Sequence, residues 1–243
     1  MTATNQKIET IEIAAGEQLT ERLVLPAVEQ LEIFVGTDSA AHLILAQPVE
    51  SLVVKVEAGA RLLLSDQQFG GSARSDIQVD LLGEGADFRL NSVLVGAGED
   101  KLQSTVAVNH FASGTTSRII TRGVLSEHAR LVHQGLVKIV AGTTGCVSEQ
   151  RAAALLLGRR ARADLRPDLQ IDSNDVRCSH AASTAGLDEN TLYYLMSRGL
   201  SRAAATQMAI SAFAAPALQG FCPREQEELF SQLTFATDVM VQP

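Results

Sequence analysis

The sequence predicts a mainly β fold, a right-handed parallel β-helix followed by a small C-terminal helical subdomain. Short runs that alternate apolar and polar residues continue to about residue 157. Glycine and other small residues recur just before new runs, and helical spacing appears only after Asp188. We therefore expect a β-helix core over residues 1–185 and a helical subdomain over residues 186–243.

The period-two runs are rich in Val, Ile and Leu, as half-buried strands are. The expected strands are Ile8–Ile13, Gln30–Val35, Ala41–Leu45, Ser51–Val56, Arg61–Leu64, Ile77–Leu82, Asp87–Val95, Ser104–Val108, Ser117–Ile120 and Arg130–Ile139. Similar junctions at Glu57–Leu62 and Gly83–Phe88 suggest a loose repeat of roughly 20–30 residues, which suits a solenoid whose turns stack on one another.

Two other architectures fit less well. A doubly wound α/β fold needs helices between its strands, and no long helical pattern interrupts this region. A β-sandwich needs hairpin turns, and Asn-Gly and Asp-Gly pairs are absent from the sequence. The segment Ala152–Leu157 fits either a short helix or a strand, and Pro167 is expected to open a strand over Asp168–Ile171.

Composition limits the function. The net charge of −8 argues against a general binder of nucleic acid or anionic membranes, because phosphate binding needs a basic face. No secretion signal or apolar run of membrane-spanning length is present. The three cysteines are odd in number and far apart, which is typical of a protein in the reducing cytoplasm and not of a disulfide framework.

The strongest chemical signal is a cysteine and a histidine two residues apart. On a strand, Cys178 and His180 project from the same face. A thiolate beside an imidazole suits iron, zinc or an iron–sulfur species. Two ligands are too few for a closed metal site, so further ligands must come from elsewhere in the fold or from another chain. Spacing alone also allows a purely structural Cys and His.

Small residues after His180 predict a turn, and helices are expected beyond it. Asp188 can cap the first helix, and Ser201 starts the second. The apolar stripe expected on the second helix comprises Ala205, Met208, Ala209, Ala212 and Phe213. A third helix is expected after Pro223, with Leu229, Phe230, Leu233 and Ala236 on its inner face.

These segments resemble a known family. Asp175-Val-x-Cys178-Ser-His180-Ala, then Leu187-Asp, then Tyr194-Leu-x-Ser-Arg-Gly199 is similar to the signature of the SufB/SufD proteins, the paired scaffold subunits of the SUF iron–sulfur cluster assembly machinery. The Cys-Ser-His order resembles the SufD side. The chain departs from the pattern at Ala181, where the family usually has glycine. We also expect a core-only member, without the N-terminal helical extension of typical members.

The resemblance implies a scaffold that is not an enzyme. It implies that the last β-strands pair with a SufB-like subunit or with a second copy, and that Cys178 and His180 transiently accept iron or the nascent cluster. ATP-driven movement of a SufC-like ATPase would uncover these two residues. The ATPase would dock on the helical segment, for which we predict as contacts Leu187, Leu192, Tyr194, Leu195, Arg198, Met208 and Phe213.

Two other functions stay open at this point. One is a β-helical assembly protein without a metal function. The other is a β-helix carbohydrate-active enzyme, for which the cluster Asp164, Asp168, Asp172 and Asp175 would have to supply the carboxylates. No phosphate-binding loop of the Gly-x4-Gly-Lys type is present, so we expect no nucleotide to bind this chain.

Overall fold

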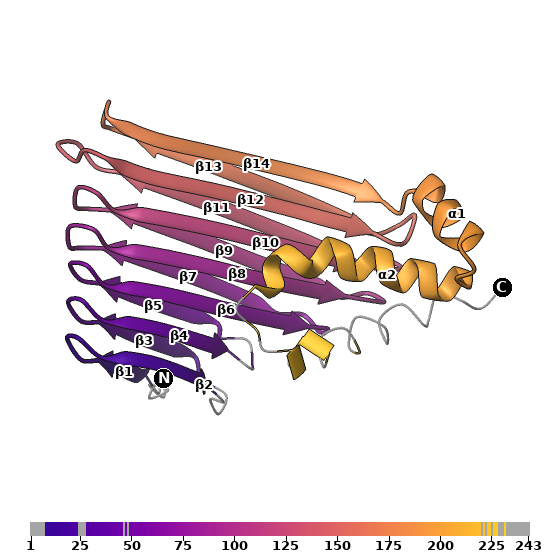
Figure 1. Cartoon of the computed structure of the whole chain (residues 1–243), viewed down its shortest axis with the longest axis horizontal. Coiled ribbons are helices and arrows are strands. Elements are labelled where there is room, and N and C mark those ends of the chain that lie inside the picture. Colours follow the sequence, from indigo (N-terminus) through magenta and orange to yellow (C-terminus); the bar gives the residue numbers. More distant parts are fainter. Residues whose placement is uncertain are drawn as a thin grey trace, which may run out of the picture.

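The computed structural model describes residues 8–23, 28–45, 47, 49–219, 221, 223, 224, 226, 227 and 231. The chain coils through parallel strands that stack from the N-terminal end to the last two strands, and the helices lie on one side of this stack (Figure 1). The predicted parallel β-solenoid is confirmed.

Alternate strands belong to alternate sheets. Within the described ranges, each sheet has seven strands. The first sheet contains, in spatial order, β1 (Ile8–Ile13), β3 (Gln30–Val35), β5 (Ser51–Val56), β7 (Arg74–Leu81), β9 (Lys101–His110), β11 (Arg130–Ile139) and β13 (Arg162–Ile171). The second contains β14 (Val176–Gly186), β12 (Cys146–Leu156), β10 (Thr116–Leu125), β8 (Asp87–Gly96), β6 (Arg61–Phe69), β4 (Ala40–Leu45) and β2 (Gln18–Leu23).

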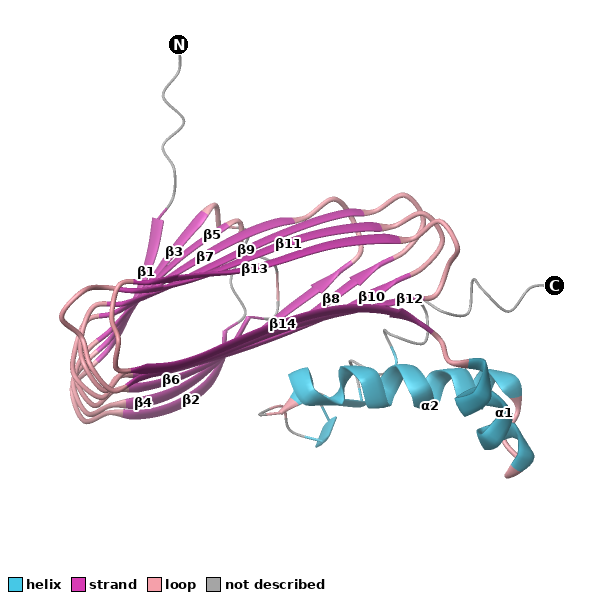
Figure 2. Ribbon diagram, turned by 90° about the horizontal axis from the view of Figure 1, so that it is seen from above, coloured by secondary structure: helices cyan, strands magenta, loops and turns pink. Residues whose placement is uncertain are grey.

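The core lies between the two sheets, which face each other across the solenoid (Figure 2). Parallel pairing keeps like positions in line, so that Leu31 pairs with Leu52 and Leu52 with Ile77 on successive turns. These side chains are almost fully buried. The alternation seen in the sequence therefore reflects one face of each strand pointing inward and the other outward.

The turns stack closely at the corners of the solenoid. A Cβ atom at Gly83 would lie 2.0 Å from the backbone nitrogen of Ala58, so only glycine fits where one turn passes over the previous one. This close approach explains why glycine recurs at the junctions between the predicted strands.

Several strand boundaries differ from the prediction. The ambiguous segment Ala152–Leu157 belongs mostly to a strand, β12. Pro167 lies inside β13 instead of opening a strand, and an edge strand tolerates proline because fewer of its N–H groups are needed for pairing. The small residues after His180 do not turn, since β14 continues to Gly186. Ala181 is therefore a strand residue that pairs with Arg151.

Two helices follow the last strand. Helix α1 (Glu189–Ser197) is capped by the Asp188 side chain, and α2 (Arg202–Ala214) by that of Ser201, as predicted. A short 3-10 segment, η1 (Ala215–Leu218), comes next. The expected third helix falls largely outside the described residues. No helix in the described part of the chain is both long and apolar enough to cross a membrane.

Helix α2 packs on the outer face of the second sheet (Figure 2). Its buried residues are Ala205, Ile210 and Ala214, whereas Met208 and Ala212 are exposed. The expected stripe was thus wrong at these two positions. The sheet meets the helix with outward apolar residues, so the helix turns its most apolar face, which includes Ile210, toward Ile120, Val124 and Leu155.

Candidate functional site

Cys178 and His180 lie on β14, the last strand of the second sheet. Register places Cys178 beside Ser148 and His180 beside Gln150, both of which are buried between the sheets. Because paired residues of parallel strands share a face, Cys178 and His180 face the interior side of the solenoid. The Cys178 side chain is half-buried, and His180 is exposed.

The exposure of His180 follows from its place at the end of the solenoid. Strands β13 and β14 each pair with only one neighbouring strand among the described residues. One turn earlier, inward-facing residues such as Val137 are fully buried, whereas their counterpart Leu169 on β13 is only half-buried. The inner face of the last turn is therefore uncovered at the top of the stack (Figure 1).

The pKa of the Cys178 thiol is raised above its ordinary value. Burial is the main cause, and the charge that Cys146 could carry adds to it, while a hydrogen bond with the backbone of Ser148 acts in the opposite direction. Cys178 is thus a neutral thiol near pH 7, and a metal that binds it must displace the thiol proton.

Beneath Cys178, buried polar side chains form a hydrogen-bonded column. Ser148 and Ser117 lie 2.8 Å apart, and Ser117 lies 2.9 Å from Nε2 of His110. Nδ1 of His110 is 2.8 Å from the Thr115 hydroxyl, which donates to the carbonyl of Ala112 at 3.0 Å. Since that hydroxyl has one proton, it accepts from Nδ1–H, and Nε2 accepts from Ser117. Burial lowers the pKa of His110 to about 4, which keeps the ring neutral.

In the turn below His180, some buried polar atoms lack partners, although Nδ1 of His133 lies 3.2 Å from the Ser104 hydroxyl. Both side-chain polar atoms of Gln150 and Nε2 of His133 are buried without a hydrogen bond. Burial also lowers the pKa of His133 to about 4. Our reading of the sequence missed Gln150 and Ser148, although Cys146, Ser148 and Gln150 are spaced two apart. Their polar character obscured the strand pattern of β12.

The arrangement provides a soft, two-ligand donor set on an open face. Among the described residues, no cluster of three or more His, Cys, Asp or Glu side chains could hold a metal ion. Sulfur and imidazole fit iron or an iron–sulfur species as cargo, but a complete coordination shell needs ligands from another molecule.

The predicted docking residues differ in exposure. Tyr194 is 56% exposed and Met208 is 49% exposed, and the Arg198 guanidinium lies 5.2 Å from the Tyr194 ring centroid. Leu195 is half-buried. Leu187 and Phe213 are half-buried against the cluster between α2 and the sheet, and Leu192 is 1% exposed.

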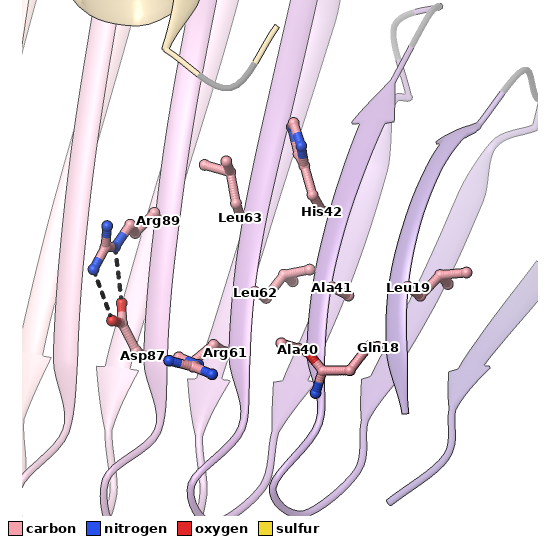
Figure 3. Close-up of a pocket in the computed structure, with 10 residues that line it drawn as sticks. All are labelled: Gln18, Leu19, Ala40, Ala41, His42, Arg61, Leu62, Leu63, Asp87 and Arg89. Atoms are coloured by element: carbon pink, nitrogen blue, oxygen red, sulfur yellow. Dashed lines mark hydrogen bonds and ion pairs between the residues drawn. The ribbon is translucent and has the colours of Figure 1, made fainter. Parts of the chain in front are cut away.

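A surface hollow of about 380 Å³ lies far from Cys178, over the first turns of the second sheet. Arg89 and Asp87 point toward each other at its edge and form a salt bridge at 3.0 Å (Figure 3). His42 and Leu63 also line it, and no pair of acid–base groups suited to hydrolysis meets there (Figure 3). The hollow does not support the carbohydrate-active alternative.

The fold and the motif agree with one family. The sequence model described as "SUF system FeS cluster assembly, SufBD core domain" matches residues 5–213. The chain belongs to the SufBD family. The matched range contains all of the described strands, α1, all of α2 except its last residue, and the Cys178–His180 pair.

Individual SufBD relatives agree with this assignment. The chain is 36% identical over 146 residues to the iron-sulfur cluster assembly protein SufD of Bacillus subtilis. The aligned residues make up 60% of this chain and 33% of that protein. It is 30% identical over 146 residues to SufD of Escherichia coli, covering 60% and 34%. A SufBD family protein of Mycobacterium bovis is 35% identical over 173 residues, covering 69% and 20%. The chain thus spans about a third or less of these relatives.

Proposed function

We propose that this chain is a SufD-like scaffold subunit of the SUF iron–sulfur cluster assembly complex. It works in the cytoplasm, is not an enzyme and binds no nucleotide itself. Cys178 and His180 take up iron or the nascent cluster transiently. The observation that carries the proposal is that these two side chains share the inner face of the last, uncovered turn of the solenoid.

The last strands pair with a SufB-like chain or with a second copy of this chain. Edge strands present unpaired backbone N–H and C=O groups, which makes them templates for another strand. Here two such edges, β13 and β14, lie at one end of the molecule, with half-buried apolar residues between them, among them Leu169 and Val176. A second subunit seated there would supply the missing ligands and cover Cys178.

A SufC-like ATPase docks on the C-terminal helices. Exposed tyrosine, methionine and arginine side chains are typical of protein interfaces. Tyr194, Arg198 and Met208 would form the direct contact, with the half-buried Leu187, Leu195 and Phe213 around it. Leu192 would hold α1 in position from the inside.

Cluster assembly reconstituted with the SufB-like and SufC-like partners tests the site. Cys178→Ala and His180→Ala should each abolish assembly while leaving the circular dichroism spectrum unchanged. Gln170→Ala is the matched control, because Gln170 lies on the exposed outer face of β13, the last strand of the other sheet. Normal assembly by both site variants would remove the proposed role and favour an assembly protein without a metal function.

A further inference from the structure

The outer face of the second sheet has a second hollow, of about 320 Å³, at its β14 end. Its lining comprises Arg122 of β10, Gln150, Arg151, Ala152 and Ala153 of β12, and Ser179, His180, Ala181 and Ser183 of β14. Ser179 and Ser183 alternate with Cys178 and His180 along the strand, so their side chains point to the face opposite the proposed iron ligands. Small residues such as Ala153 leave room between them.

Positive charge is concentrated on this face. The outward positions of β10, β12 and β14 carry Arg118, Arg122, Arg151 and Arg177, but only one carboxylate, that of Glu149. Glu149 is shared, since one of its oxygens lies 2.8 Å from Arg118 and the other 2.5 Å from Arg151. This excess of positive charge stands out in a chain whose net charge is −8.

Arg122 has no counter-ion within the part of the chain that the structure describes. No carboxylate of the described residues forms a salt bridge with it, and its Nη1 donates instead to the Thr121 carbonyl at 3.1 Å. The guanidinium stacks 5.6 Å from the Phe213 ring centroid, which holds it against α2. Burial lowers the pKa of Arg122, and the nearby charge of Arg151 lowers it further.

A half-buried cation without a counter-ion is unfavourable, and the like charge of Arg151 nearby adds repulsion. An anion bound between the two guanidinium groups would offset both the cost of burial and the repulsion. The guanidinium fork matches the geometry of a carboxylate or phosphate, and a fork already fixed by stacking loses little freedom when it binds. The hydroxyls of Ser179 and Ser183 make no hydrogen bonds with described residues, so they are available as additional donors.

We propose that this hollow binds an oxyanion, a carboxylate or phosphate group, between the guanidinium groups of Arg122 and Arg151, with Ser179 and Ser183 as further donors. The anion is either a free oxyanion or an acidic side chain of a partner protein. Arg89 shows the contrast, because Asp87 already neutralises it with two hydrogen bonds, at 3.3 and 3.0 Å (Figure 3).

Titration of the full chain with two probes tests the proposal. The probes are inorganic phosphate and an acetylated tetraglutamate peptide, and binding is followed by calorimetry and by the arginine Nε–H signals in NMR spectra. Binding of at least one probe should shift the Arg122 signal. It should weaken about tenfold or more in both Arg122→Gln and Arg151→Gln. It should also weaken as salt is added.

Arg89→Gln is the matched control and should bind like the parent chain. Phosphate binding that depends on Arg122 and Arg151 identifies a free oxyanion, and binding of the peptide alone identifies a partner carboxylate. Absence of binding by both probes, or equal binding by all variants, overturns the proposal. If Arg122→Gln does not fold, Arg151→Gln alone decides. Cys178→Ala should bind normally, so failure of the iron site and failure of this site are distinguishable.

Discussion

Gln150 on β12 reaches across the interior of the solenoid to Gly135 on β11, where a Cβ atom would lie 1.4 Å from its Nε2. The buried amide therefore fits only because the facing residue has no side chain. Gln150 also lies directly beside His180 in the register of β12 and β14. Gln150 therefore links the interior contact between β11 and β12 to β14, the strand that carries Cys178 and His180.

Gly135→Ala should lower the free energy of unfolding by about 1–3 kcal/mol, because the added methyl group would overlap the buried Gln150 amide and force it to move. Gln150→Ala should remove the clash. The free energies of unfolding of both single variants and of the double variant can be measured by denaturant unfolding. The two changes should be strongly non-additive, and additive losses would show that the residues do not contact each other.

Asp66 predicts a pH dependence of stability. It is fully buried between the sheets, and burial raises its pKa from 3.8 to about 6, despite hydrogen bonds from Ser92 and Gln68. Since the folded state favours the protonated acid, its stabilising effect is complete below pH 4 and is lost as the pH rises through about 6. The shift corresponds to about 3 kcal/mol.

Asp66→Asn stays neutral at every pH. The variant should match the parent near pH 4 and exceed its free energy of unfolding by up to about 3 kcal/mol at pH 8. Urea unfolding at both pH values provides the comparison, and taking the difference between the two proteins cancels the other titrating groups. A difference that does not change with pH would show that burial does not raise the pKa of Asp66.

If a second subunit associates through β13 and β14, a charge placed on the inner face of these strands should weaken the association. Leu169→Asp places a carboxylate on the uncovered inner face of β13, so we expect about tenfold or greater weakening of association with the SufB-like chain or with a second copy. Sedimentation velocity measures the association. Gln170→Asp, one residue away on the exposed outer face, should have little effect. Equal effects of both changes would argue against pairing at this end.

The helices predict the place of ATPase docking. Combined Tyr194→Ala and Met208→Ala should weaken binding of the SufC-like ATPase about tenfold or more, because large exposed side chains near an interface centre contribute most of its energy. Surface plasmon resonance gives the affinity. Phe111→Ala is the control, since Phe111 is exposed in the turn before β10, at the end of the strands away from α1. Unchanged binding of the double variant would place the ATPase elsewhere.

The solenoid could be predicted from the sequence because its strands alternate strictly, as Gln30–Val35 and Ser51–Val56 do. Strand β2 was missed because Gln18–Leu23 has only two apolar residues. The segment Ala152–Leu157, most of which belongs to β12, was ambiguous because it is an unbroken run of alanine and leucine, with no alternation to separate a strand from a helix. Alternation identifies a strand only where one face is apolar and the other polar.

The shared face of Cys178 and His180 could be predicted from spacing alone, because residues two apart on a strand share a face, whereas their role in iron binding rests on the family resemblance and stays a prediction. Contacts between sheets could not be found in this way. That Gln150 faces Gly135, or that Phe213 holds Arg122, depends on how the coil closes and on where α2 returns to the sheet. Neither relationship leaves a local pattern in the sequence.

The most direct measurement is an anaerobic titration of the chain with ferrous iron in the presence of its SufB-like partner, followed by thiolate-to-iron charge-transfer absorption. We expect a saturable band that is lost in Cys178→Ala, reduced in His180→Ala and retained in Cys146→Ser, because Cys146 is fully buried. A band of undiminished intensity in Cys178→Ala would contradict it.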